Sequence, residues 1–389
     1  MRSPHGVVGV TAYTDNAMTV SRHYLDHAAT SALRPEAREV LLAHLDAGNP
    51  SAAHTAGRRA RALLEQAREE IAAAVGAEPI EVIFTSGGTE ANNLAIYGLA
   101  AARPGKPILA APIEHEAVLR PARAVGMTEM PVDSAGRAVI KPIEPDTYAA
   151  VALMAANNET GAIQPIADAA AAAQAAGVPL HVDAVQAMGH MLIDVHSDGI
   201  STMSLSGHKF GGPRGIGALI ATRGTDVKAQ ILGGGQEREL RSGTQDVASA
   251  LAMAAALTAA QTDMAAENAR IAALRDELRA GIEARVDGVV VHTTEPALPG
   301  HLHISIPGAE GDSLILLFDQ AGIDLSTGSA CHAGVSRPSH VLLAMGVDER
   351  TARGALRFTL GWNSTADDIA AVLADVERIA AAARIAGMA

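Results

Sequence analysis

The 389-residue sequence predicts an α/β protein with a large, mainly parallel sheet and a smaller α+β domain at its C-terminal end. Three observations support this fold class. Short apolar runs alternate with helix-like segments, which is typical of a parallel sheet covered on both faces. Glycine and polar residues follow several of these runs directly. The pattern changes after about residue 250, and a chain of this length tends to divide into two domains.

In the first part of the chain, residues 57–77 carry apolar positions at helical spacing and reach a helix stop at Gly76. The apolar runs that follow are short enough for buried strands, and helical segments separate several of them. The expected strands are residues 81–87, 107–112, 150–157, 179–185, 200–206 and 217–222. A helix is expected to follow the first strand from Thr89, and the alanine-rich run at 167–177 is expected to be an ordinary helix.

The second part begins with a helical stretch over about 245–286. Three strand-like and two helix-like segments then indicate a small α+β domain. They are the strands 288–294, 301–307 and 355–361 and the helices 311–322 and 365–386. We expect a disordered N-terminal extension at 1–23, a large domain at 24–250 whose first residues pack on the small domain, and a small domain at 251–389 with a cysteine-bearing loop at 324–338.

Composition excludes several classes of function. Hydrophobic residues make up 48% and charged residues 19%, and no segment approaches the roughly 20 apolar residues of a membrane span. The net charge of −13 argues against nucleic acid as a partner. Cys331 is the single cysteine, so neither an internal disulfide nor a thiolate-rich metal site is expected. The histidines lack metal-ligand spacing, so no metal is expected. A reducing cytoplasm is the expected location.

Polar groups at the ends of the predicted strands are the candidates for chemistry, because ligands bind at that edge of a parallel sheet. Residues 85–90 form a glycine-rich strand-to-helix turn, which is suited to a phosphate but is also common as a simple turn. Asp183 could cap a helix or pair with a protonated ring nitrogen. Lys209 could be solvated or could be a desolvated, imine-forming amine. His115 could be a helix cap or a catalytic imidazole. Together these groups match the requirements of pyridoxal 5′-phosphate (PLP).

Ten motifs, in chain order, resemble those of the NifS/IscS-type cysteine desulfurases, which are class V aminotransferases of PLP fold-type I. They are "YLDHAAT" (24–30), "NPSAAHTAGR" (49–58), "FTSGGTEANNLAI" (84–96), "EHEAVL" (114–119), "NNETG" (157–161), "HVDAVQAMG" (181–189), "SGHKFGGPRGIGAL" (206–219), "GGGQERELRSGT" (233–244), "STGSAC" (326–331) and "LRFTLG" (356–361). The resemblance runs from Tyr24 nearly to the end of the chain. It implies a seven-stranded sheet in the large domain.

The resemblance also implies a role for individual residues. Lys209 would form the imine with PLP, Asp183 would pair with the pyridine nitrogen, and Gln186 would donate to the ring oxygen. His115 would stack on the ring and shuttle protons. The other implied cofactor contacts are Gly88, Thr89, Asn158, Ser206 and His208, with Thr244 reaching the phosphate of the second subunit of a homodimer. Arg357 would bind the substrate carboxylate, and Asn158 would lie beside the substrate.

The implied reaction removes sulfur from L-cysteine, giving L-alanine and a persulfide on Cys331, whose thiolate is the nucleophile. The sulfur acceptor could be an iron–sulfur scaffold, a tRNA-thiolation relay or a cofactor pathway.

Two departures from the IscS pattern are His332 after the cysteine and "GWN" at 361–363, where "GRF" is usual. The end at "ARIAGMA" also suggests that a longer docking tail is absent. The alternatives are a selenocysteine lyase or another C–S lyase, and a catalytically reduced sulfur-relay partner.

Overall fold

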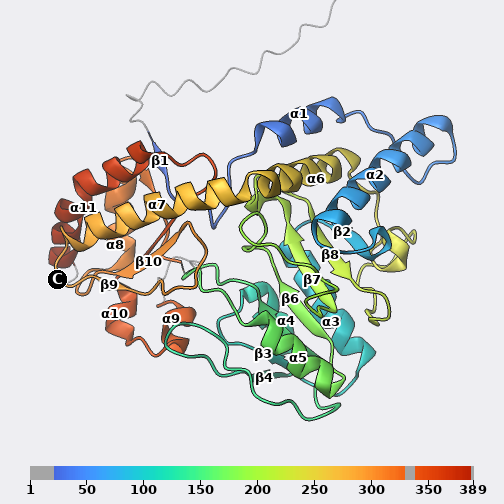
Figure 1. Cartoon of the computed structure of the whole chain (residues 1–389), viewed down its shortest axis with the longest axis horizontal. Coiled ribbons are helices and arrows are strands. Elements are labelled where there is room, and N and C mark those ends of the chain that lie inside the picture. Colours follow the sequence, from blue (N-terminus) through green and yellow to red (C-terminus); the bar gives the residue numbers. More distant parts are fainter. Residues whose placement is uncertain (1–21, 329–337, 387–389) are drawn as a thin grey trace, which may run out of the picture.

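The computed structural model describes residues 22–328 and 338–386. Most of the predicted extension at 1–23 lies outside the described residues, as does most of the predicted cysteine loop at 324–338, including Cys331. Figure 1 shows the arrangement of the chain, with a large sheet and its helices beside a smaller group of strands and helices that includes α8 and α11.

The large sheet has seven strands, as expected, and is mainly parallel, since only β8 runs antiparallel to its neighbours β2 and β7. In spatial order the strands are β2 (Val82–Thr85), β8 (Gly217–Ala221), β7 (Thr202–Ser206), β6 (Leu180–Asp183), β5 (Ala150–Met154), β3 (Ile108–Ala110) and β4 (Met127–Glu129). The six predicted strands of this part are present. The sequence did not predict β4, because this edge strand has only three residues and none of them is buried.

Helices cover both faces of this sheet, which explains why its central strands β5, β6 and β7 are buried along their whole length. Successive side chains of a strand point to opposite faces, so Ile83 joins a core with α3 and α4 while Val82 and Phe84 join a core with α2, α5 and α6. The helices are α1 (Pro35–Ala43), α2 (Thr55–Ala74), α3 (Gly88–Ala102), α4 (Glu116–Val125), α5 (Ile166–Ala176) and α6 (Val247–Thr262).

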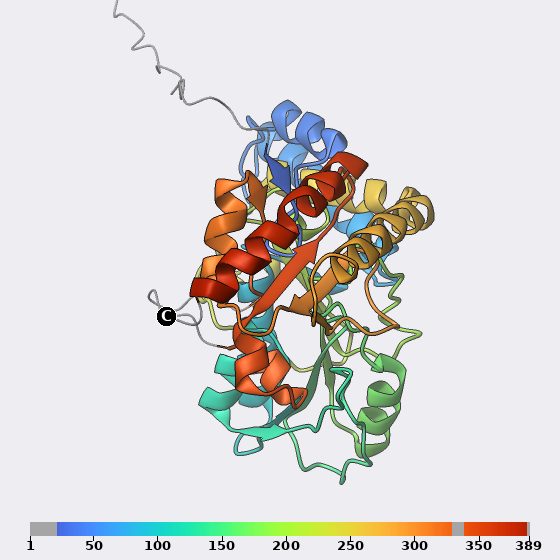
Figure 2. The same ribbon diagram turned by 90° about the vertical axis from the view of Figure 1, so that its left-hand side faces the viewer.

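A second core lies in the smaller unit, where α7, α8 and α11 pack on an antiparallel sheet of order β12-β10-β9. Figure 2 shows α11, the red helix, across the front of this unit. Leu25 belongs to this core, and the strand β1 beside it pairs with β11. The elements are β1 (His23–Tyr24), α7 (Met264–Glu283), β9 (Val290–Val291), β10 (His301–Ser305), α8 (Gly311–Gln320), β11 (Ile323–Asp324), α9 (His340–Ala344), α10 (Glu349–Arg353), β12 (Ala355–Thr359) and α11 (Ala366–Ala386).

The helical stretch predicted over 245–286 is two helices, α6 and α7, which meet at Asp263. This residue follows the last residue of α6 and precedes the first of α7, and its backbone (φ −99°, ψ 3°) departs from helical geometry. Among the described residues, no helix is both long and apolar enough to cross a membrane. In the same residues, no group of three or more metal-ligating side chains is placed to hold an ion.

Candidate active site

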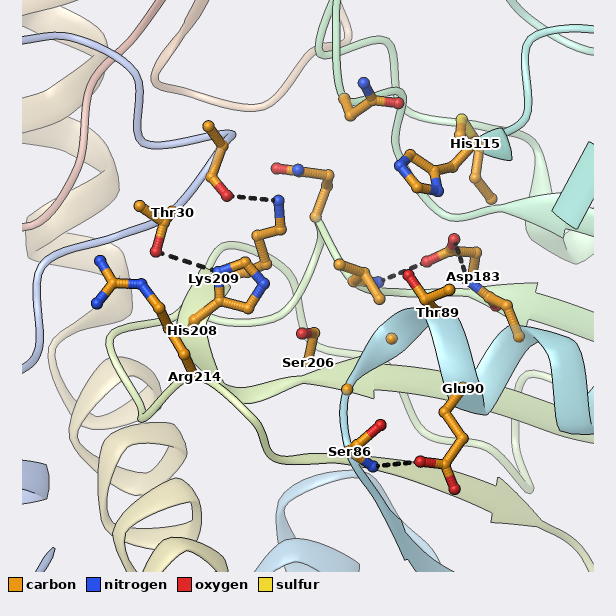
Figure 3. Close-up of a pocket in the computed structure, with 18 of the residues that line it drawn as sticks. Thr30, Ser86, Thr89, Glu90, His115, Asp183, Ser206, His208, Lys209 and Arg214 are labelled. Atoms are coloured by element: carbon orange, nitrogen blue, oxygen red, sulfur yellow. Dashed lines mark hydrogen bonds between the residues drawn. The ribbon is translucent and has the colours of Figure 1, made fainter. Parts of the chain in front are cut away.

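A cavity of about 450 Å³ lies at the carboxyl ends of the central strands, where a parallel sheet places its ligand sites. Strand β6 ends at Asp183, strand β7 ends at Ser206, and α3 begins at Gly88 beside them. Nine of the predicted site residues line this one cavity: Gly88, Thr89, His115, Asn158, Asp183, Gln186, Ser206, His208 and Lys209. In the view of Figure 3, Lys209 and His208 lie on one side and His115 and Asp183 on the other.

The glycine-rich turn before α3 forms one wall of the cavity. Gly87 has φ 149°, a backbone conformation that favours glycine. A Cβ atom on Gly88 would lie 2.7 Å from a methyl group of Val185 and 3.3 Å from the Cβ of Ser206, so only hydrogen fits there. The first N–H groups of a helix have no partner within the helix and carry its positive dipole end. The N-terminus of α3, together with the nearby Ser206, can therefore bind an anion such as a phosphate.

Asp183 is held by a buried hydrogen-bond chain. Its Oδ1 accepts from the backbone N–H of Val185 at 3.0 Å, and its Oδ2 accepts from the Asn92 amide at 2.7 Å. The Asn92 oxygen is 2.9 Å from Nε2 of His181, so this nitrogen must carry the proton. Nδ1 of His181 is then free to accept from the hydroxyl of Thr202, which is 2.9 Å away. Burial lowers the pKa of His181 to about 3, which keeps its ring neutral.

Lys209 follows strand β7 and is desolvated by the fold. Burial, with the positive charge of Arg357, lowers the pKa of Lys209 to about 8, against the opposing charges of Asp26 and Asp183. Its Nζ donates to the backbone oxygens of Ala28 and Ala29, at 2.5 and 3.0 Å. The amine can therefore become neutral close to physiological pH, which a nucleophilic lysine requires.

Burial lowers the pKa of two histidines of the cavity, and the contacts of one of them also locate its proton. His115 caps α4, with its Nδ1 accepting from the backbone N–H of Ala117 at 3.1 Å, so the proton of the neutral ring is on Nε2. Burial is the main cause that lowers the pKa of His115. Nδ1 of His208 is 3.1 Å from the hydroxyl of Thr30. Burial, with Lys209 and Arg214, lowers the pKa of His208 to about 4.

Arg357 does not line the cavity but adjoins it. It lies buried on β12, where its Nη1 donates to the backbone oxygen of Asn158 at 2.9 Å. Its Nη2 pairs with Asp26 at 2.7 Å. Gln186 is in the cavity wall and uses its amide to donate to the oxygen of Ala28 at 2.8 Å. The sequence indicated Arg357 and Gln186 but gave no sign of the ion pair with Asp26.

Among the described residues, Arg357 and Thr244 are the two predicted site residues that do not line this cavity. Thr244 lies exposed on the segment that joins β8 to α6, and Cys331 is outside the described residues. The nearby Arg241 pairs with Glu90 at 2.7 Å, which fixes that segment against the first turn of α3.

Sequence reasoning missed several residues that shape the cavity: Thr30, Asn92, His181 and Arg214. Asn92 could have been found, since it follows Gly88 by one helical turn and so faces the same side of α3. His181 precedes Asp183 by two positions on β6, which places both side chains on one face of the sheet. Arg214 and Thr30 are in loops, whose path no sequence period indicates.

Comparison with known proteins identifies the family. The model of the family "Aminotransferase class-V" matches residues 23–372. An "IscS-like cysteine desulfurase" from Mycobacterium tuberculosis is 44% identical over 94% of this chain and 98% of its own length. A "Cysteine desulfurase IscS" from Dictyoglomus turgidum is 40% identical over 92% of this chain and 94% of its own. A "Cysteine desulfurase NifS" from Azotobacter vinelandii is 37% identical over 93% of each chain.

Solved structures agree with these relatives. A "NIFS-LIKE PROTEIN" superposes with a TM-score of 0.86 at 33% identity, covering 92% of this chain and 99% of that one. DndA from Streptomyces lividans superposes with a TM-score of 0.71 at 36% identity, covering 86% and 99%. The predicted fold class, that of the fold-type I PLP enzymes, is therefore confirmed. The chain belongs to the class V aminotransferases and, within that family, to the cysteine desulfurases of the NifS/IscS type.

Proposed function

We propose that the protein uses PLP to remove sulfur from L-cysteine, giving L-alanine and a persulfide on Cys331. The observation that carries this proposal is the single cavity in which a desulfurase's groups meet. An anion site at α3, a hydrogen-bonded carboxylate at Asp183, a desolvated amine at Lys209 and a neutral imidazole at His115 all line it.

The cavity fits PLP by size and by the chemistry of its donors. Its volume of about 450 Å³ falls within the usual range for small-molecule sites. Asp183 receives only two hydrogen bonds from the described protein, so lone pairs of its oxygens remain for a ring N–H. Gly87 has no side chain, and a Cβ atom there would meet only the Ser206 hydroxyl at 3.9 Å, so a phosphate can approach the backbone at the start of α3.

When bound, PLP would supply an electron sink for the α-carbon of the substrate. Lys209 would hold the cofactor covalently, Asp183 would keep its ring nitrogen protonated, and Gln186 would lie beside its ring oxygen. Ser206, His208 and the first turn of α3 would hold its phosphate. His115, with its proton on Nε2, would stack on the ring and move protons to and from the substrate.

Cysteine would bind with its carboxylate at Arg357, whose planar guanidinium suits a two-oxygen anion. Attack by the Cys331 thiolate on the substrate sulfur then forms an S–S bond and breaks the C–S bond. The electron pair of the broken bond stays with the carbon skeleton, which takes up a proton and leaves as alanine. The sulfur stays on Cys331 as a persulfide, ready for transfer to an acceptor.

One experiment tests this reaction directly. The purified holoenzyme is mixed with L-cysteine, and alanine and protein-bound persulfide are measured together. We expect equal amounts of the two in the first turnover, with the persulfide on Cys331. Cys331→Ser should keep the visible absorption of PLP and bind cysteine, yet form almost no alanine. Alanine without persulfide on Cys331 would contradict the mechanism.

We further infer a homodimer in which the exposed Thr244 reaches the phosphate of the neighbouring site. A reducing cytoplasm suits a persulfide, and an iron–sulfur scaffold or a thiolation relay suits it as acceptor. Light scattering should give twice the monomer mass. Dimers that combine one Lys209→Ala chain with one Thr244→Ala chain test whether each site is built from both subunits. If it is, one of the two sites in such a dimer has both residues intact.

A further inference from the structure

Glu159 lies buried at the point where both ends of the segment containing Cys331 meet the rest of the protein. It has 1% of its surface exposed and follows β5 in the loop after Asn158. The Asn157 side chain fixes this loop, since its oxygen accepts from the backbone N–H groups of Glu159 and Thr160 at 2.9 and 3.0 Å. The carboxyl group of Glu159 is therefore held on a rigid support.

The carboxyl group contacts residues on each side of the undescribed segment. On the C-terminal side, the hydroxyl of Ser339, which is itself buried, donates to Oε2 of Glu159. On the N-terminal side, a Cβ atom on Gly328 would lie 3.0 Å from the same oxygen. Gly328 has φ +86°, so a side chain there would be disfavoured by the backbone as well.

These two contacts are close to the nucleophile in sequence. Cys331 follows Gly328 by three residues, each of which spans at most about 3.6 Å. The same stretch of chain is tied to the proposed substrate site, because Ser326 and Arg357 form a backbone bridge and Arg357 donates to the oxygen of Asn158. The short loop 157–159 thus contacts the guanidinium of Arg357 and also the two ends of the Cys331 segment, Gly328 and Ser339.

A second cavity lies beside Glu159 and adjoins the cavity proposed to hold PLP. Its lining includes Glu159, Gly328 and His340, and it shares Thr89, His115 and Asn158 with the cavity proposed to hold PLP. His340 is fixed by a contact of 3.1 Å between its Nε2 and the backbone oxygen of Glu114. The segment ends therefore lie in the wall of a cavity that adjoins the cavity proposed to hold PLP.

From this geometry we propose that Glu159 is a positioning residue that binds one end of the Cys331 segment at Ser339, packs against the other end at Gly328, and so sets the rate at which Cys331 takes sulfur. The inference rests on the proposed function. Glu159 itself does not line the cofactor cavity, so its removal should affect the sulfur-transfer step more than cofactor or substrate binding.

The test compares Glu159→Leu with Glu159→Gln in the holoenzyme. The Leu variant removes the acceptor of the Ser339 hydroxyl, whereas Gln keeps an acceptor oxygen. We expect Leu to slow single-turnover persulfide formation about tenfold and Gln to slow it by no more than about threefold, since only Leu loses the bond. The cysteine concentration that half-saturates the change in PLP absorption should stay within about twofold of wild type in both.

Three further variants separate this role from a merely structural one. Ser339→Ala should slow persulfide formation at least as much as Glu159→Leu, because it also removes the N-cap of α9, where the Ser339 oxygen accepts from the N–H of Leu342. Ser339→Thr, which keeps the hydroxyl, should behave like Glu159→Gln. Glu81→Leu is the matched control, because Glu81 is equally buried but contacts His196 and Arg223 instead. It should lower the melting temperature without slowing persulfide formation in the enzyme that remains folded.

A double variant gives the decisive outcome. In Cys331→Ser, the addition of Glu159→Leu should cause no further loss of the residual turnover, because both changes act on one step. A further tenfold loss, or a wild-type persulfide rate in Glu159→Leu, would overturn the role of Glu159 and leave the desulfurase reaction intact. Failure of the desulfurase proposal itself is distinct, because the wild-type enzyme would then form no persulfide on Cys331.

Discussion

At the scale of single residues, the charge of Lys209 is set by burial and by the neighbours Arg357 and Asp26. The pKa of about 8 predicts that apoenzyme captures PLP faster as pH rises through this value, because only the neutral amine attacks the carbonyl. Arg357 lowers this pKa, so Arg357→Gln should move the midpoint of the capture rate to higher pH. Asp26 raises it, so Asp26→Asn should move the midpoint to lower pH.

The measurement is the growth of the visible absorption of bound PLP after rapid mixing, as a function of pH. Lys209→Ala is the control and should show no capture. A midpoint that stays unchanged in both charge variants would contradict the electrostatic account of Lys209.

Asn92 is a second residue whose effect can be predicted, because it connects Asp183 to His181. Asn92→Leu leaves the His181 N–H and one Asp183 oxygen without a buried partner, which costs about 1–3 kcal/mol. We expect PLP to dissociate more readily, because Asp183 is then held less firmly beside the ring nitrogen. Equilibrium dialysis of PLP reports this effect.

Asn93→Leu is the matched control for this change. Asn93 is next in α3 but does not line the cofactor cavity, and its amide donates to the backbone oxygens of Thr89 and Ala117. Equal loss of PLP from both variants would show that the buried chain to Asp183 has no special role.

The sequence could predict the residues at strand ends, because apolar runs locate the strands and a parallel sheet brings their carboxyl ends together. Asp183, Ser206 and Lys209 come directly after such runs. Asp26 and Arg214 could not be predicted in this way, since they are in loops that reach the site by tertiary packing. The contacts of Glu159 with residues 328 and 339 join segments about 170–180 positions apart in sequence, which no local pattern reveals.

At the scale of elements, the turn at 237–239 is strained, because three consecutive non-glycine residues there have positive φ angles of 45°, 56° and 63°. Each such residue costs roughly 1–2 kcal/mol. The buried carboxylate of Glu237 offsets this cost, since it pairs with Arg68 and accepts from the backbone N–H of Phe84 at 2.9 Å. The strained turn therefore holds the segment before Thr244 against the large sheet.

This strain predicts opposite effects for the same substitution at two exposed sites. Glu239→Gly should raise the free energy of unfolding by about 1 kcal/mol, because glycine adopts a positive φ without a steric penalty. Glu69→Gly, in the exposed face of α2, should lower it by about as much. Denaturant titration of the two holoenzymes gives both values, and a destabilised Glu239→Gly would contradict the strain argument.

At the scale of the whole molecule, Arg34 joins the large sheet region to the smaller unit. Its guanidinium pairs with Glu267 of α7 through two bonds of 2.8 and 2.7 Å. Its Nε donates to the backbone oxygen of Phe210, the residue after Lys209, at 3.2 Å. It also lies 5.4 Å from the centre of the Trp362 ring, so the unusual "GWN" sequence supplies a cation–π contact at this junction.

The largely buried pair of Arg34 with Glu267 predicts a coupled loss of stability and cofactor. Arg34→Met leaves the Glu267 carboxylate without its partner, which should cost about 3–5 kcal/mol. Because Arg34 also holds Phe210, PLP should leave Lys209 at a lower temperature in this variant. The double variant with Glu267→Leu removes both charges and should recover part of the stability.

The exposed pair Arg353–Glu349 is the control, and Arg353→Met should change the free energy of unfolding by less than about 1 kcal/mol. Thermal unfolding followed by PLP absorption and by circular dichroism measures both effects, and equal losses at Arg34 and Arg353 would show that the junction carries no special coupling.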